Sequence, residues 1–290
     1  MSTYLESELI LNRDGSIFHL KLFPDQIADY VILVGDPARV AWVGQFLDRV
    51  ENLATNREFT SLSGFYHQTK VLVLSTGIGT DNMDIVVNEL DALANIDINR
   101  REDKPSKRRL KLIRIGTSGS LQPDLPVGSS VASAWSIGLD GLMNYYQRKA
   151  DHERDTFQKS LIVSTDWPAL LPHPYAAKAA PRLLKLAESF CTKGITVAAH
   201  GFYGPQGRQI RATLAYPNLN EKLQSFRFDD LRTTNFEMES SALYGLGEVL
   251  DHEALTVCLI IANRMTGDFL GEYSSQIKNL IDKTLNSVII

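Results

Sequence analysis

The stretch "YVILVGDPARVAWVGQFL" (Tyr30–Leu47) combines an apolar, β-branched run, a glycine turn and a helical repeat. A continuous apolar run that ends at a turn is typical of a buried strand. Pro37 stands where a first helical turn would begin, and Val40, Val43 and Leu47 then recur along one helical face. The segment therefore predicts a buried strand that leads directly into a helix.

The same alternation continues along most of the chain. Runs rich in β-branched residues predict buried strands, and between several of them apolar residues recur at helical spacing. This pattern favours the α/β class, with a three-layer α/β/α sandwich around a mixed, largely parallel central sheet. No internal repeat or linker stands out, so we expect a single domain over residues 1–290. The predicted strands are Tyr30–Gly35, Lys70–Gly77, Leu110–Gly116, Leu161–Thr165, Ile195–Ala199 and Thr256–Ala262, and the predicted helices are Pro37–Leu47, Asp81–Asn95 with Asp81 as its cap, Pro174–Phe190, Glu239–Asp251 and the segment from Tyr273.

Composition and charge narrow the class of protein. Hydrophobic residues make up 44% of the 290 residues and charged residues 22%, a balance that can fill a sizeable core. The net charge of −4 offers no general attraction to nucleic acid or to an anionic membrane, and we expect neither as a partner. The acidic start "MSTYLESELILN" is unlike a secretory signal, and Cys191 and Cys258 lie in apolar stretches. We therefore expect a cytoplasmic protein with reduced, buried cysteines.

One segment departs from the alternation. "DINRREDKPSKRRLK" (Asp97–Lys111) collects many charges around a proline. Its basic residues are mixed with acidic ones and lack interleaved aromatic residues, unlike a nucleic-acid patch. We expect a solvated loop.

Glycine turns follow three of the predicted strands and carry groups suited to an anion. Glycine allows close backbone approach, and helix N-termini offer free N–H donors. Arg39 follows the first turn, Arg114 precedes the third, and Arg57 lies in "NREFTSLSG". Each arginine alone is more typical of a surface charge. Together with the hydroxyl-bearing "GTSGS" they favour a phosphate site, because guanidinium groups match phosphate geometry.

Several other kinds of site are disfavoured. "GIGTDN" has Asn82 where a dinucleotide fingerprint needs its third glycine, and no P-loop lysine pattern occurs. No Gly-x-Ser-x-Gly elbow is present. The six histidines are scattered, without His-x-x-x-His spacing, so we expect no metal.

"NFEMESSALYG" (Asn235–Gly245) places two glutamates at the predicted start of an apolar helix. Acidic residues favour a first helical turn because of the exposed N–H groups and the macrodipole. A carboxylate at such a position can also bind ligand hydroxyls. The stretch by itself leaves both interpretations open.

Eight motifs in a fixed order make the pattern specific: "IFHLKL", "VGDPARV", "NREFTSLSG", "STGIG", "RIGTSGSLQP", "GFYGPQGR", "NFEMES" and "ANR". This ordered set resembles the uridine phosphorylases of the nucleoside phosphorylase superfamily, from Phe18 to the C-terminal helix. Each motif alone is weak, and "FYGPQGR" is the part that favours pyrimidines over purines. The resemblance implies a nucleoside phosphorylase-like fold and no cofactor, with inorganic phosphate as co-substrate.

The resemblance also implies roles for individual residues. Arg39, Arg114, Arg208 and Glu239 would be the catalytic residues, and two groups, Arg57 and His19, would come from a neighbouring subunit. A homodimer would then be the smallest active unit, with a hexamer as a further assembly. The implied sets are Gly35, Arg39, Arg57, Arg114 and Thr117 for phosphate, His19, Glu237, Met238 and Glu239 for ribose, and Phe202, Gln206, Arg208, Ile261 and Ala262 for the base.

The proposed base-reading pair makes chemical sense. Uracil offers two carbonyl acceptors and an N3–H donor, whereas cytosine has an amino group and a bare N3. Arg208 has donors only, while Gln206 can accept from N3–H and donate to O2. We therefore expect reversible phosphorolysis of uridine to uracil and ribose 1-phosphate, a pentosyltransferase reaction of pyrimidine salvage.

Two other functions stay open. One is a purine nucleoside phosphorylase or a related nucleosidase, although Asn263 stands near the place where purine enzymes carry an aspartate. The other is a non-catalytic sensor of nucleosides or phosphate. A sequence without the arginines or without the Glu-Met-Glu segment would favour a sensor, but this sequence has both.

Overall fold

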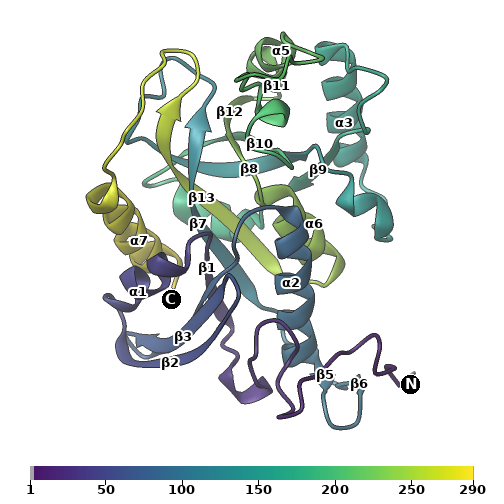
Figure 1. Ribbon diagram of the computed structural model, residues 1–290, viewed down its shortest axis with the longest axis vertical. Helices are drawn as coiled ribbons and strands as arrows, with labels where there is room; N and C mark the ends of the chain where they lie inside the picture. The colour runs from purple at the N-terminus through teal and green to yellow at the C-terminus, as the bar shows by residue number, and fades with distance from the viewer. Residues whose placement is uncertain (1–2, 290) are drawn as a thin grey trace.

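The computed structural model describes residues 3–289 and has three layers, with helices on both sides of a mixed sheet (Figure 1). This confirms the predicted fold class. The strands are β1 (Tyr30–Val34), β2 (Asp48–Asn56), β3 (Phe59–Tyr66), β4 (Thr69–Ser75), β5 (Ile96–Asp97), β6 (Glu102–Asp103), β7 (Lys111–Ser120), β8 (Ser130–Gly138), β9 (Tyr175–Lys178), β10 (Thr192–Ala198), β11 (Arg227–Phe228), β12 (Leu231–Glu237) and β13 (Glu253–Asn263). The helices are α1 (Pro37–Gly44), α2 (Thr80–Asn95), α3 (His152–Thr165), α4 (Pro181–Ala187), α5 (Leu219–Ser225), α6 (Ser240–Val249) and α7 (Ser274–Val288), with short 3₁₀ turns at Pro24–Gln26, Leu142–Tyr145 and Gly204–Gln206.

The sheet has a parallel centre and closes on itself at one end. Its order is β11-β12-β10-β8-β13-β7-β1-β4-β3-β2, and β1 pairs in parallel with both β4 and β7. β12 also pairs antiparallel with the end of β7, where Phe236 faces Gly119. Strands β7, β13, β8, β10 and β12 therefore form a ring of paired neighbours, which is the arrangement of a small barrel.

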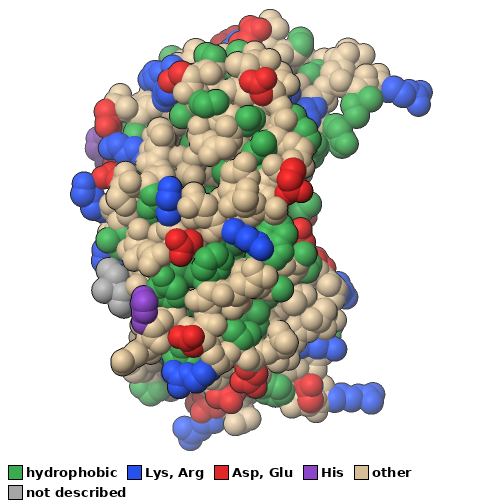
Figure 2. Space-filling model, turned by 90° about the vertical axis from the view of Figure 1, so that its left-hand side faces the viewer, with side chains coloured by type: hydrophobic (Ala, Val, Ile, Leu, Met, Phe, Trp, Pro, Cys, Tyr) green, Lys and Arg blue, Asp and Glu red, His purple; other side chains and the backbone are tan. Residues whose placement is uncertain are grey.

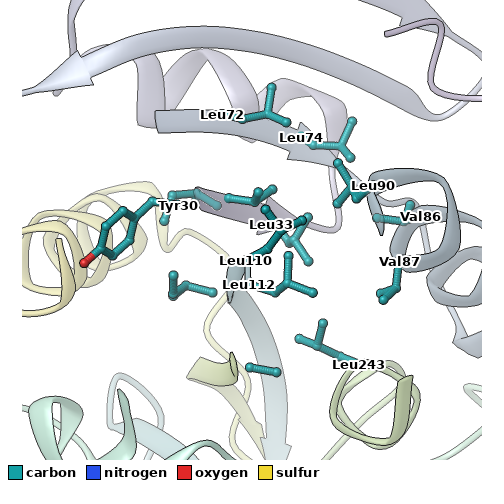
Figure 3. Packing of buried hydrophobic residues seen from close by; sticks show 14 of the residues in the cluster. Tyr30, Leu33, Leu72, Leu74, Val86, Val87, Leu90, Leu110, Leu112 and Leu243 are labelled. Atoms are coloured by element: carbon teal, nitrogen blue, oxygen red, sulfur yellow. The ribbon is translucent and has the colours of Figure 1, made fainter. Parts of the chain in front are cut away.

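Helices cover the two faces of the parallel centre. α2 and α6 lie on one side, and α1 and α7 lie on the other (Figure 1). Figure 3 shows Leu33 of β1, Leu72 and Leu74 of β4 and Leu112 of β7 in one buried cluster, with Leu74 close to Leu90 of α2. These leucines are fully buried, as expected for strands covered on both faces.

Some predictions of secondary structure were wrong. Asp81 does not cap α2, because the helix begins at Thr80 with Gly79 at the cap position. Leu161–Thr165 is the last turn of α3 and not a strand: Phe157, Leu161 and Thr165 are buried four residues apart, while Val163 is 80% exposed. The predicted helix Pro174–Phe190 contains β9, which pairs antiparallel with β8, and only α4 is helical. Pro181 opens α4 and disfavours helix in the residue before it.

The charged segment Asp97–Lys111 is not simply a solvated loop. It contains the β5–β6 hairpin, and its cations bind backbone carbonyl groups. Arg101 Nε donates to Tyr4 O (2.9 Å), and Lys104 Nζ donates to Ala94 O (2.9 Å). These bonds attach the N-terminal segment and the end of α2 to the hairpin.

The surface carries both signs of charge, as the numbers of acidic and basic residues in the sequence predict. Acidic and basic side chains are interspersed on the face shown in Figure 2. Both cysteines are buried and free, as predicted. Within residues 3–289, no helix has the length and apolar character needed to cross a membrane.

Candidate active site

A cavity of about 440 Å³ opens where the ring of strands ends. Its walls come from the ends of β7, β12 and β13 and from the turn around Phe202–Arg208. A volume in this range suits a small organic ligand. Ten of the predicted site residues line it: Arg114, Thr117, Phe202, Gln206, Arg208, Glu237, Met238, Glu239, Ile261 and Ala262.

Backbone pairing explains why these distant segments meet. β13 runs parallel to β7, with Thr256 opposite Arg114. β12 reaches the same place from the other side, because it pairs with the end of β7. The segment Glu237–Glu239, which links β12 to α6, is therefore held beside Arg114.

The floor of the cavity is a buried ionic cluster of Arg114, Glu237 and Glu239. Arg114 Nη1 lies 3.2 Å from Glu237 Oε2, and Nη2 contacts Glu239 Oε2. Glu239 Oε1 accepts a hydrogen bond from Gly79 N (2.7 Å) in the turn before α2. All three side chains are at most 5% exposed.

The cluster has one cation and two carboxylates, and the pKa values of Arg114 and Glu239 are both shifted. Burial alone would lower the pKa of Arg114, but Glu239 and Glu237 outweigh it and raise that pKa. Burial raises the pKa of Glu239; Arg114 opposes this, and Glu237 adds to it. A single guanidinium therefore cannot fully stabilise both carboxylates.

The two glutamates of Glu-Met-Glu have different surroundings. The Glu237 carboxylate accepts from Glu239 N (3.0 Å), from Ser240 N (3.0 Å) and from the Ser240 hydroxyl, and so caps the start of α6. The capping interpretation therefore applies to Glu237. Glu239 makes no such cap, and its carboxylate lies between Arg114 and the glycine turn. α6 begins at Ser240, one residue later than predicted.

The opposite wall is the turn that carries Phe202, Gln206 and Arg208. The Arg208 guanidinium stacks over the Phe202 ring at 3.8 Å and donates to Phe202 O (2.7 Å) and to Gln206 Oε1 (2.5 Å). Gly207 has a φ of +65°, and a Cβ there would lie 2.3 Å from Asn220 Nδ2. Glycine is therefore required between the two polar residues.

Arg208 has no ion-pair partner among residues 3–289. Burial, followed by repulsion from Arg264, lowers its pKa to about 10. The side chain is still a cation at neutral pH, and its charge is not compensated by a carboxylate.

Four predicted residues lie outside the lining of the cavity. Gly35 and Arg39 follow β1, and Arg39 is buried beside Tyr273, with Nη2 3.4 Å from the hydroxyl. Arg57 is exposed in the turn between β2 and β3. His19 lies next to that turn, because Asn56 Nδ2 donates to His19 O (2.8 Å). The roles predicted for these four residues remain predictions.

Sequence reasoning missed some residues of the cavity. Arg264 lines it and supports the turn, donating from Nη1 to Gln206 O (3.1 Å). It belongs to the motif "ANR", which was the available signal. Asp268 and Phe269 also line the cavity and belong to no motif. Asn263 is structural, because it donates to Gln122 O (2.9 Å) and Leu125 O (3.0 Å).

Within residues 3–289, no group of three or more histidine, cysteine, aspartate or glutamate residues is arranged to hold a metal ion.

Comparison with known proteins gives a consistent picture. The model of the Phosphorylase superfamily matches residues 29–286. A uridine phosphorylase from Haemophilus influenzae is 31% identical, over 95% of this chain and 96% of the relative. One from Thermococcus kodakarensis is 29% identical, over 92% and 84%. The solved structure of a Trypanosoma brucei nucleoside phosphorylase, described as showing uridine phosphorylase activity, has a TM-score of 0.87 and 28% identity, covering 97% of this chain and 99% of that one.

Proposed function

The chain belongs to the phosphorylase superfamily, and we propose that within it the protein is a uridine phosphorylase, which converts uridine and phosphate to uracil and ribose 1-phosphate. One observation carries the proposal. A glutamine and a positively charged arginine form one wall of the cavity, and Arg114, ion-paired with a glutamate that caps no helix, forms part of its floor. The wall suits a uracil ring, and the carboxylate of Glu239 on the floor suits the hydroxyl groups of a sugar.

The wall can discriminate between bases. Gln206 accepts from uracil N3–H and donates to O2, and Arg208 donates to a carbonyl oxygen. In the structure Gln206 Oε1 accepts a hydrogen bond from Arg208, and the N3–H of a bound uracil would take the place of this donor. Cytosine would leave polar groups unpaired, and a site built on buried hydrogen bonds can reject such an analogue by a factor on the order of 10⁴.

In the proposed reaction, a phosphate oxygen forms a bond to C1′ while the C1′–N1 bond breaks. The electron pair of that bond leaves on uracil. The sugar carries positive charge in the transition state, as glycosyl transfers commonly do. Arg208 stabilises the negative charge that develops on uracil, and the protein otherwise positions the reactants and excludes water. No cofactor and no covalent intermediate are needed.

The phosphate and the 5′ end of the sugar need further groups. Arg39 and Gly35 contribute to phosphate from the end of β1, together with Arg114 and Thr117. Arg57 and His19, which lie together outside the cavity of their own subunit, contribute to a neighbour. The smallest active unit is then a homodimer, which a hexamer can contain.

The test is to incubate the protein with uridine, with and without phosphate or arsenate, and to measure free uracil. We expect release only when the anion is present. Equal release without it would identify a nucleosidase. Cleavage of inosine in preference to uridine would identify a purine phosphorylase, and binding of uridine without any turnover would identify a sensor.

A further inference from the structure

The side chain of Glu89 lies in α2 and contacts His19, seventy positions earlier in the chain. His19 Nδ1 is 2.6 Å from Glu89 Oε1. The same carboxylate accepts from the backbone N–H groups of His19 (3.1 Å) and Leu20 (2.9 Å). The two side chains are 24% and 13% exposed, so water only partly screens the contact. Glu89 belongs to none of the eight motifs and does not line the cavity.

This contact determines how the imidazole ring presents its two nitrogens. An ionised carboxylate can only accept hydrogen bonds, so Nδ1 must carry a proton and donate it to Glu89. In the neutral ring, Nε2 is then left as a free acceptor. Within residues 3–289, no hydrogen bond involves Nε2, so the structure leaves that nitrogen available. A second group that orients a functional histidine in this way is a recurring device.

Packing fixes the position of the ring as well as its tautomer. The ring lies edge-on to Phe18, with centroids 4.7 Å apart, and edge-on to Phe59 at 6.4 Å. Asn56, beside Arg57 in the β2–β3 turn, binds the His19 carbonyl. His19 therefore lies beside the turn that carries Arg57.

We propose that Glu89 is a positioning residue, which holds His19 so that Nε2 accepts a hydrogen bond from the 5′-hydroxyl of a nucleoside bound in the neighbouring subunit. The inference rests on the proposed function and on the assignment of His19 to the neighbouring site. It adds that a carboxylate on α2 of one subunit affects 5′-hydroxyl recognition in the other. Glu89 itself touches no substrate.

Glu89 also has a structural role, because it accepts hydrogen bonds from two backbone N–H groups. The test must therefore separate 5′-hydroxyl recognition from general damage. We would compare kcat/KM for uridine and for 5′-deoxyuridine, which lacks that hydroxyl. In Glu89→Ala we expect a roughly tenfold loss on uridine and less than about twofold on 5′-deoxyuridine, which corresponds to one lost hydrogen bond. His19→Ala should show the same pattern, and the double variant should lose little more.

Glu221→Gln is a matched control, since it removes an exposed glutamate charge from α5 and should leave both substrates unaffected. An equal loss on the two substrates in Glu89→Ala would overturn the proposal and leave only the structural role.

Subunit mixing then tests whether Glu89 acts on the neighbouring site. Arg208→Leu subunits should be nearly inactive but carry intact His19 and Glu89. When they are mixed with Glu89→Ala subunits, the site with the intact Arg208 receives intact His19 and Glu89 from its partner. Discrimination between uridine and 5′-deoxyuridine should therefore rise toward the wild-type ratio. If subunit exchange is verified and the ratio stays at the Glu89→Ala value, Glu89 acts within its own subunit and the proposal is wrong.

The tautomer gives a readout that does not depend on activity. Histidine labelled with ¹⁵N should show His19 with a protonated Nδ1 and a bare Nε2, with the resonance assigned by its absence in His19→Asn. In Glu89→Gln the side-chain amide can donate to Nδ1, so the tautomer should reverse. A wild-type ring with its proton on Nε2 alone would refute the proposal even if every variant misfolded. Failure of the proposed function is distinguishable, because wild-type protein would then release no uracil from uridine and phosphate.

Discussion

The two arginines on opposite sides of the cavity have contrasting surroundings. Arg114, on the floor, is buried against two carboxylates, and these raise its pKa above the ordinary value. Arg208, in the turn, is partly exposed, stacks on Phe202 and has no carboxylate partner among the described residues, and burial with Arg264 lowers its pKa. The floor is thus held together by its own charges, whereas the turn keeps a positive charge uncompensated.

The different surroundings of Arg114 and Arg208 suit two different tasks in the proposed reaction. A floor fixed by internal ion pairs is preorganised before a ligand arrives, but its formal charge is −1 when both glutamates are ionised. In the proposed reaction it needs further cations to hold a phosphate dianion, and this is the role proposed for Arg39 and Arg57. The uncompensated charge of the turn can instead stabilise a leaving group that becomes negative only in the transition state.

The largest effect should come from breaking the floor. Glu237→Ala removes a partner of buried Arg114 and the cap of α6. Arg114 keeps Glu239 as its partner, so the main cost comes from the buried N–H groups of Glu239 and Ser240, which lose their acceptor at roughly 1–3 kcal/mol each. We expect the free energy of unfolding, measured by urea titration, to fall by several kcal/mol, and the urea midpoint to fall with it. Asp124→Ala, which breaks the more exposed pair with Arg232, should change the midpoint very little. A midpoint equal to wild type in Glu237→Ala would show that the floor is not held by this pair.

The next effect concerns the turn. Arg208→Leu should raise the reaction barrier for uridine by roughly 2–4 kcal/mol, because a charged hydrogen bond to the leaving group is lost. The urea midpoint and the affinity for phosphate should stay close to wild type. Arg211→Leu, at an exposed arginine of the same loop, is the control. Activity of Arg208→Leu within about threefold of wild type would exclude the assigned role.

Glu239→Gln should separate function from stability on the floor itself. It keeps the shape of the side chain but removes the charge that is proposed to bind the ribose hydroxyl groups. Uridine should therefore lose more kcat/KM than 2′-deoxyuridine, by about 1–2 kcal/mol. Equal losses on the two substrates would argue against direct recognition of the 2′-hydroxyl.

Relative to wild type, Glu239→Gln should become more stable as the pH rises. Because the pKa of Glu239 is raised in the folded state, folding favours its protonated form. That contribution is present below the ordinary pKa of 4.5 and is lost as the pH rises through the folded-state pKa. Glutamine does not titrate, so the urea midpoint of Glu239→Gln relative to wild type should be higher at pH 8 than at pH 5. A difference that does not change with pH would mean that Arg114 satisfies both carboxylates.

The smallest effect tests whether Arg57 of one subunit acts in the active site of a neighbouring subunit. Arg57→Ala and Arg208→Ala proteins should each be poor enzymes. If they are dissociated and mixed equally, about half of the dimers are mixed and each has one intact site, so about a quarter of wild-type activity should return. Verified subunit exchange without recovery would place Arg57 in its own subunit or outside the site.

The sequence by itself determined the parallel centre of the sheet and the order of the motifs. β1, β4 and β13 are almost continuous apolar runs, and such runs identify doubly covered strands without knowledge of their partners. The glycine turns and the residues of "GFYGPQGR" and "NFEMES" were also recognisable locally, because their signals lie within a few positions of one another.

The tertiary structure alone decided which of these residues meet. β2, β8 and β12 carry mixed or polar sequences, so their pairing depends on neighbours far along the chain, and Leu161–Thr165 became helical because Phe157 and Leu161 share a buried face. The same holds for two of the glutamates. The contact of Glu239 with Gly79 and the contact of Glu89 with His19 follow from backbone paths that cross between elements, whereas the helix cap at Glu237 is local, over two or three positions. Local spacing carries no information on such crossings, because the contacting residues are separated by tens of positions and are brought together only by burial of the shared core.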